Sequence, residues 1–187
     1  ASVEGARRAD GPIFARLGTS EVVKAAMESD HWKSPLEKNG PNGKLRGRGV
    51  ASGFWMNGAG KSSVSLMLDT DGAVMMTEGS ADIGGTRASI AMQAAEVLGL
   101  PAEDIHPSIP DTDSIAYTGV TGGSRTTHAT GWAAINAAES LVSQLKERAA
   151  QLWGIEVGDV DFSAGVFSSG TDPELSIAIK ELASRLS

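Results

Sequence analysis

The chain has 187 residues, a length typical of one compact domain with or without a tail, and its 41% hydrophobic and 21% charged residues exclude a disordered or fibrous protein. A net charge of −7 has the wrong sign for neutralising a phosphate backbone, so nucleic acid is not expected as a partner. The absence of cysteine excludes disulfides, iron–sulfur clusters and a thiol nucleophile within this sequence. No apolar run reaches the ~18 residues of a membrane span, and we expect a cytoplasmic protein that binds no membrane.

A short helix and a linker are predicted at the N-terminus. Apolar residues at positions 22, 23, 26 and 27 form one stripe, which predicts a helix over residues 19–32 that packs on the domain following it. Proline and glycine cluster in residues 33–44, a composition typical of a linker. The sequence therefore predicts a helical segment and linker in residues 1–45 and one domain in residues 46–187.

A β-hairpin is predicted at the start of that domain. Residues 50–56 read as a first strand, and Val64, Leu66 and Leu68 alternate strictly, as in a half-buried strand. Asp71-Gly72 between two apolar runs is a strong hairpin signal. We therefore expect residues 73–77 to return as the neighbouring strand.

Two helices are predicted, each after a glycine-rich run. The first follows residues 79–86 and ends at Gly99, and the second begins between residues 124 and 127. Shorter elements are a strand over residues 105–109, one or two strands within 157–167 and a helix over 175–186. Together these elements predict an α+β fold, a two-layer mixed sheet with two main helices. Their expected apolar faces hold Ile90, Ala94 and Val97 or Leu98 in the first helix, and Ala134, Ala138, Leu141, Leu145 and Leu152 in the second.

Three apparent ligand motifs fail on spacing. Gly60-Lys61-Ser62 resembles the end of a phosphate-binding loop, but the required first glycine is replaced by Trp55. The run from Asp69 to Gly72 resembles a calcium loop, yet its glycine comes too early, and a hairpin turn accounts for it better. The three histidines share no metal-ligand spacing, so we assign no metal ligand.

Two glycine-rich helix starts are candidates for an anion site. Gly84-Gly85-Thr86 and Gly122-Gly123-Ser124 each place glycines and a hydroxyl before a predicted helix. Helix N-termini present unpaired N–H groups and a partial positive charge, and glycine lets an anion approach the backbone. Two such starts could hold one phosphate-rich ligand. The alternative is that the glycines form turns and the hydroxyls are ordinary N-caps.

Arg87 and Arg125 fall in the first turns of the two predicted helices. The helix dipole favours acidic side chains there, by about 0.3 to 1 kcal/mol for an exposed group. The mismatch therefore permits an anion at either helix start without demanding one.

Several ordered segments of the chain are similar to one family. Residues 79–89, Gly-Ser-Ala-Asp-Ile-Gly-Gly-Thr-Arg-Ala-Ser, follow a G-G-x-E-x-G-Q-G-x-x-T segment, and residues 95–101 follow an A-E-x-L-G-[IL]-P helix end. Asp111-Thr112-Asp113 matches D-T-D, and residues 121–127 match T-[AG]-[AG]-S-x-[ST]-T. Spread over residues 46–150, these segments resemble the molybdopterin-binding large subunits of the xanthine dehydrogenase and aldehyde oxidase group.

The resemblance implies a cofactor-binding domain of the molybdenum type. Both glycine-rich helix starts would hold the pterin and pyrophosphate of a molybdenum–molybdopterin cofactor in its cytosine dinucleotide form. The family's Gln in G-Q-G falls at Gly85, so its side-chain amide is missing. The family's catalytic Glu has no counterpart, and we assign no catalytic residue. The residues implied as cofactor-binding are Gly84, Gly85, Thr86, Thr121, Gly122, Gly123, Ser124, Arg125 and Thr126.

The function implied by the resemblance is that of an oxidoreductase, as part of the molybdopterin-binding subunit of a molybdenum hydroxylase. Its partners would be the rest of the large subunit, the domains or subunits that carry iron–sulfur clusters and flavin, and a small-molecule substrate, an aldehyde or an N-heterocycle. We expect this chain alone to be inactive. The alternative is a non-catalytic binding or interaction module that kept the scaffold and lost the cofactor.

Two expectations concern single residues. We expect Gly123 to leave space for the cofactor, so that Gly123→Val blocks cofactor retention and barely changes the fold. We expect Arg125 to lie near a cofactor oxyanion. Arg125→Ala should then weaken the cofactor-bound form and leave the cofactor-free chain unchanged or slightly more stable.

Overall fold

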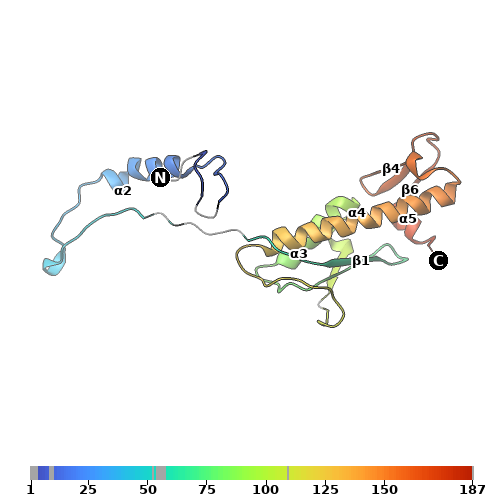
Figure 1. Ribbon diagram of the computed structural model, residues 1–187, viewed down its shortest axis with the longest axis horizontal. Helices are drawn as coiled ribbons and strands as arrows, with labels where there is room; N and C mark the ends of the chain where they lie inside the picture. Colours follow the sequence, from blue (N-terminus) through green and yellow to red (C-terminus); the bar gives the residue numbers. More distant parts are fainter. Residues whose placement is uncertain (1–3, 9–10, 52, 54–57, 109, 187) are drawn as a thin grey trace. The chain divides into compact units, whose positions relative to one another are not determined.

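The computed structural model describes residues 4–8, 11–51, 53, 58–108 and 110–186 (Figure 1). The chain divides into two compact units, residues 1–54 and residues 55–187. The domain boundary expected after residue 45 stays a prediction. No helix in the described part of the chain is long and apolar enough to cross a membrane.

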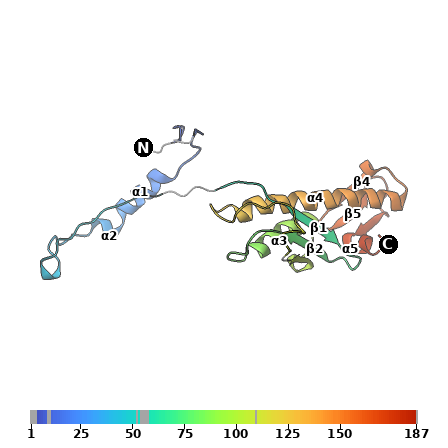
Figure 2. The same ribbon diagram turned by 60° about the horizontal axis from the view of Figure 1, so that its bottom comes forward.

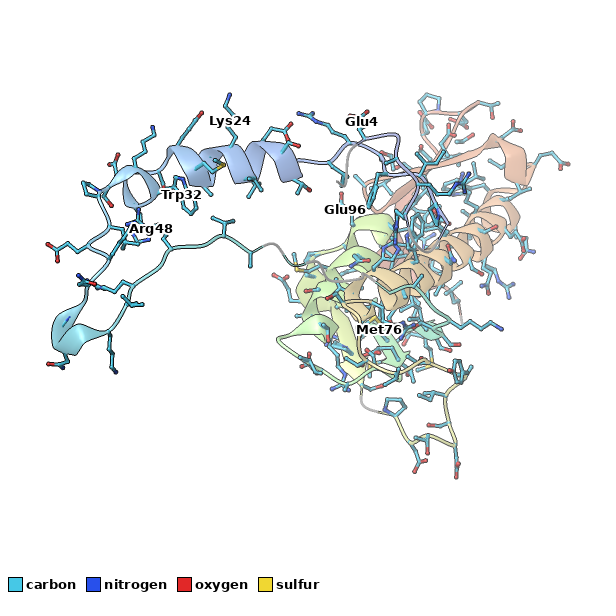
Figure 3. The ribbon with its side chains drawn as sticks, turned by 60° about the vertical axis from the view of Figure 1, so that its left-hand side comes forward. Glu4, Lys24, Trp32, Arg48, Met76 and Glu96 are labelled. Atoms are coloured by element: carbon cyan, nitrogen blue, oxygen red, sulfur yellow. The ribbon has the colours of Figure 1, made fainter. Side chains whose placement is uncertain are left out.

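The N-terminal unit holds two short helices, α1 (Thr19–Glu28) and α2 (Asp30–Lys33), and a 3₁₀ turn, η1 (Pro41–Gly43). The predicted single helix is interrupted because Ser29 is extended, with φ −64° and ψ 149°, and its hydroxyl accepts from the Trp32 N–H at 3.2 Å. Figure 3 shows Arg48 beside Trp32, where its guanidinium donates to the Trp32 carbonyl at 2.6 Å. This bond ties the chain after η1 back to α2.

The apolar stripe of α1 is not covered within its own unit. None of the residues of α1 is buried, and Val22 is 69% exposed. Whether the stripe packs on the following domain stays a prediction. Of the strand expected over residues 50–56, positions 50, 51 and 53 are not in a strand, and the other positions lie outside the described residues. A strand needs a partner ladder, and residues 50, 51 and 53 have none.

The first sheet of the second unit is mixed, with strand order β1-β2-β3. Strands β1 (Val64–Leu68) and β2 (Val74–Glu78) form the predicted antiparallel hairpin, with Leu68 opposite Val74. The Asp71 carboxylate accepts from the Ala73 N–H at 2.8 Å and closes the turn. Strand β3 (Ile105–Ser108) pairs parallel with β2, because a helix crosses over between them.

Helices α3 (Thr86–Leu98) and α4 (Thr126–Trp153) bury the core against this sheet. Both begin where the sequence predicts. At their crossing, a Cβ on Gly131 would collide with the amide end of the Gln93 side chain, which would have to move. The fully buried core side chains include Val74, Met76, Ile90, Ala94, Leu98, Ala134 and Ala138.

A second, antiparallel sheet lies along the C-terminal part of α4 (Figure 2). Its strands are β4 (Val160–Ser163), β5 (Val166–Ser169) and β6 (Ser176–Ala178), with the 3₁₀ turn η3 (Val157–Asp159) before them. The Phe162 and Phe167 rings stack with centroids 4.6 Å apart. The predicted α+β class with two main helices is confirmed, and the strands divide between two small sheets.

Two details of the C-terminal region differ from expectation. The helix predicted over residues 175–186 is wrong in its first part, because β6 completes the ladder beside β5 and leaves only a short helix, α5 (Ile179–Ala183). Leu152 is 45% exposed, since the last turn of α4 turns the neighbouring Trp153 toward the core instead. The turn η2 (Ala102–Asp104) joins α3 to β3.

Two glycines that end helices give a test of this packing. Gly99 and Gly154 both have left-handed backbone, at φ 61° and 68°, but a Cβ on Gly99 would collide with the backbone of Ala164 and Gly165, whereas one on Gly154 meets no described atom within 4 Å. Gly154→Ala should therefore lower the free energy of unfolding by about 1 kcal/mol, and Gly99→Ala by at least about 3 kcal/mol because of the added clash. Urea unfolding of both variants measures the difference, and equal losses would contradict the close approach.

Candidate functional site

The start of α3 has the geometry that its glycines predict. Gly84 and Gly85 are both left-handed, at φ 65° and 80°, and Gly85 is the N-cap residue of the helix. A Cβ on either glycine would meet no described atom within 4 Å. The backbone before Thr86 is therefore open to a ligand.

A carboxylate already occupies part of this helix start. Asp82 Oδ1 accepts from the Arg87 N–H at 3.2 Å and from the Thr86 hydroxyl at 3.4 Å. An acidic group at a helix N-terminus satisfies unpaired donors and the dipole. A second anion at α3 would face the charge of Asp82, so α3 is a weaker anion site than the glycine pattern predicts.

The dipole mismatch expected at Arg87 is resolved inside the protein. Its Nε donates to Glu78 Oε1 at 3.1 Å, and its Nη2 donates to the Ser80 carbonyl at 3.0 Å. Glu78 is fully buried. Sequence reasoning missed Glu78, although its position in the alternation Val74, Met76, Glu78 places it on the inward face of β2.

The start of α4 lacks a comparable cap. The helix begins after Arg125, whose side chain does not cap it, and the first turn holds no acidic residue. Thr126 Oγ1 is buried and has no hydrogen-bond partner among the described residues. In the described part of the chain, the leading N–H groups of α4, a 28-residue helix, thus have no side-chain cap.

The loop before α4 combines open and strained positions. Gly122 is exposed, and a Cβ there would meet no described atom within 4 Å. Gly123 and Ser124 have φ of 60° and 55°, and the left-handed region is unfavourable for a serine. Thr121 is half-buried and begins this loop.

Arg125 is a buried cation. Its side chain is 5% exposed, and its guanidinium donates to the carbonyls of Gly119 and Lys61, each at 2.8 Å, to the Ser62 hydroxyl at 3.0 Å and to the Val120 carbonyl at 3.3 Å. All of these acceptors are neutral, and within the described ranges no carboxylate forms an ion pair with Arg125. A positive charge without a counter-ion thus lies at the N-terminus of α4.

These contacts correct two expectations. Arg125 joins two segments of the cofactor-free chain, so its removal is expected to destabilise that form, not to leave it unchanged. Gly123 is left-handed, so Gly123→Val is expected to strain the fold as well as fill space. Gly60-Lys61-Ser62, which resembled a phosphate-binding loop, instead accepts the guanidinium, and a Cβ on Gly60 would lie 3.0 Å from its Nε.

The structure connects the two helix starts only indirectly. No hydrogen bond joins residues 84–86 to residues 121–126 in the described part of the chain. The helices meet further along, where Gln93 Nε2 donates to the Thr127 carbonyl at 3.3 Å. In the same described part, no three His, Asp or Glu side chains form a group that could hold a metal.

Comparisons with known proteins identify relatives of the chain. The profile of the molybdopterin cofactor-binding domain family matches residues 23–186. The chain is 31% identical over 177 residues to the probable hypoxanthine oxidase XdhD of Escherichia coli (strain K12), covering 92% of this chain and 18% of that protein. It is 28% identical over 168 residues to the aldehyde oxidoreductase molybdenum-binding subunit PaoC of the same organism, covering 84% and 21%.

Solved structures agree with the fold. The reconstituted CO dehydrogenase from Oligotropha carboxidovorans matches with a TM-score of 0.62 and 30% identity, over 66% of this chain and 16% of that chain. The quinoline 2-oxidoreductase from Pseudomonas putida 86 matches in fold, with a TM-score of 0.58 and 24% identity over the same shares. The chain spans about a fifth of the length of the curated relatives it matches. Because the family match spans residues 23–186, the chain belongs to the molybdopterin cofactor-binding domain family.

Proposed function

We propose that the chain holds part of a molybdopterin dinucleotide at the N-terminus of α4, within a molybdenum hydroxylase. The single observation that carries the proposal is the buried, unpaired charge of Arg125 beside an uncapped 28-residue helix. A cation there opposes the helix dipole, and a bound oxyanion compensates both. The residues that would hold the oxyanions are Thr121, Gly122, Gly123, Ser124 and Thr126.

In this proposal Arg125 does not contact the cofactor directly but positions the loop that does. Its Nη atoms donate to carbonyls and to a hydroxyl, so it fixes the loop before α4 and raises the positive potential at the helix start. The Thr126 hydroxyl, buried and without a partner in the described chain, is a donor suited to a ligand oxygen.

The start of α3 contributes backbone only. Gly84 and Gly85 leave space for the ligand, and Thr86 presents the first N–H of the helix. Gly85 stands where the family has Gln, so no side-chain amide reaches the ligand from this position. Asp82 caps the same turn, and this carboxylate is the observation that favours the alternative, a binding module that has lost the cofactor.

The relatives of this chain are molybdenum oxidoreductases. When bound, the cofactor supplies the redox centre for hydroxylating a small aldehyde or N-heterocycle. The described residues bind and orient it, and none of them is placed as a general base. We propose the cytosine dinucleotide form, with the iron–sulfur clusters, flavin and base on other domains or subunits.

The test is the molybdenum and pterin content of the complex purified from its source. Near one equivalent of each per copy of this chain supports the proposal. A complex that contains the chain and lacks both would overturn it and support the binding module.

Glycines at the helix start separate cofactor binding from folding. Gly122→Val should lower bound pterin at least about tenfold with little change in melting temperature, because a Cβ there meets no described atom but fills the ligand's approach. Gly123→Val should lower both, because of its left-handed backbone. Gly158→Val, at another open glycine, is the matched control and should change neither quantity. Normal pterin in the Gly122 variant would show that the loop only forms a turn.

Arg125→Met tests the buried cation. The change keeps the aliphatic stem and removes the guanidinium donor from the Gly119 carbonyl and from the Lys61 carbonyl, which retains the Gly119 N–H as a second donor. The free energy of unfolding of the cofactor-free chain should therefore fall by about 3 kcal/mol. Arg148→Met removes an exposed arginine of the same helix and should stay within about 0.5 kcal/mol of the wild type. Urea unfolding measures both, and matching values would contradict the role of Arg125.

The isolated chain should show no hydroxylase turnover even when supplied with cofactor, because the base and electron-transfer centres lie elsewhere. Dye-linked oxidation of aldehydes and purines is the assay. Activity at the level of the whole complex would show that this chain contains its own catalytic groups.

A further inference from the structure

A buried carboxylate near the start of α3 has no part in the contacts proposed for the cofactor. Glu78 ends β2 with its side chain fully buried, and four hydrogen bonds join Glu78, Ser80 and Arg87. Glu78 Oε2 accepts from the Ser80 N–H at 2.6 Å and from the Ser80 hydroxyl at 2.5 Å. Arg87 donates to Glu78 Oε1 and to the Ser80 carbonyl.

These bonds hold Ser80 at three atoms. Its N–H, its hydroxyl and its carbonyl all bond to Glu78 or Arg87, one residue from the end of β2 and the other from the first turn of α3. We call Glu78, Ser80 and Arg87 the clamp. It fixes both ends of the segment 81–86, which contains the two open glycines.

Between those ends the segment has little else to hold it. Gly84 and Gly85 would gain no contact from a Cβ, and glycine loses more backbone freedom on folding than other residues. Inside the segment, the Ile83 N–H donates to the Ala81 carbonyl at 3.0 Å, and the Arg87 N–H donates to Asp82. The Thr86 hydroxyl donates to the Ala81 carbonyl at 3.3 Å and to Asp82 at 3.4 Å, and the Gly85 carbonyl accepts from the Ser89 N–H at 3.2 Å. The conformation of the glycines therefore depends on the clamp and on these local bonds.

A stabilising role alone does not explain the charges in the clamp. Replacing a buried ion pair with apolar residues of similar size is often neutral or stabilising. What an apolar pair cannot do is hold Ser80 by directed hydrogen bonds. The geometry of the clamp is thus suited to fixing the loop in one conformation.

We propose that Glu78 and Arg87 are positioning residues that hold the segment 81–86 in the conformation that receives the cofactor. The proposal rests on the proposed function for its ligand. A loop already ordered before binding loses less entropy when the ligand binds, so the clamp raises affinity without touching the ligand.

The test is the double variant Glu78→Leu/Arg87→Met in the full chain. The matched control is Asp104→Leu/Lys180→Met, which removes an ion pair of 2.7 Å distant from the loop. Amide exchange at Ile83 and at the backbone N–H of residue 87 is the key measurement, because their acceptors, Ala81 and Asp82, remain in place. We expect exchange about tenfold faster than in the control, with a melting temperature within a few degrees of the wild type.

Bound pterin, measured in the assembled complex, should fall about five- to tenfold in the clamp variant and stay normal in the control. Wild-type exchange at Ile83 and Arg87, or normal pterin despite faster exchange, would overturn the positioning role. If the wild-type complex contains no pterin, the proposed function fails, and the exchange measurement still decides whether the clamp orders the loop.

A second variant covers the case in which the double variant does not fold. Arg87→Lys keeps a charge beside Glu78 but cannot bond both Glu78 and the Ser80 carbonyl in the same way. We expect it to fold, to accelerate exchange at Ile83 by a smaller factor and to lower bound pterin in the same direction. Unchanged exchange and unchanged pterin in this variant would also overturn the proposal.

Discussion

The burial of the Arg125 guanidinium among neutral acceptors is the constraint on which the candidate site depends. Burying a charge is unfavourable unless hydrogen bonds satisfy it, and here the acceptors come from two segments distant in sequence, residues 61–62 and 119–120. The same bonds therefore fix the approach to β1, the loop before α4 and the start of α4. They leave the positive charge itself without an ion-pair partner in the described chain, and that is why an anion is expected at this place.

The two glycine-rich helix starts differ in how the charge of the neighbouring arginine is balanced. At α3, Asp82 caps the first turn and Glu78 neutralises Arg87, so charge is balanced within the protein. At α4, no carboxylate performs either role among the described residues. Two segments that look equivalent in sequence thus differ in electrostatics. The α4 start is the stronger candidate for an oxyanion, and the α3 start is better suited to backbone contact with a neutral part of the ligand.

Much of the fold was predictable from local signals. Asp71-Gly72 predicts the hairpin, and the spacing of Ile90, Ala94 and Val97 or Leu98 predicts the apolar face of α3, on which the structure buries Leu98. Features that depend on distant partners were not predictable. Strand β6 has only three residues, too few to show a period in the sequence, and it forms because β5 lies beside it. The direction of the Arg125 side chain likewise depends on residues 61–62, which are distant in sequence and accept its hydrogen bonds. The alternation in β2 marks Glu78 as an inward-facing position, but the sequence does not identify Arg87 as its partner.

In the proposed function, the clamp and Arg125 hold two loops that contain many glycines in place for a ligand. Glycine permits close approach but makes the free loop disordered, and a disordered loop binds weakly because it must be ordered first. In both loops an arginine at or next to the first turn of the following helix, Arg87 or Arg125, donates to a backbone carbonyl at the start of the loop and so ties its two ends together. The arginines that seemed misplaced against the helix dipole are therefore explained by loop geometry in both cases, and the proposed anion concerns Arg125 alone, whose charge no described carboxylate balances.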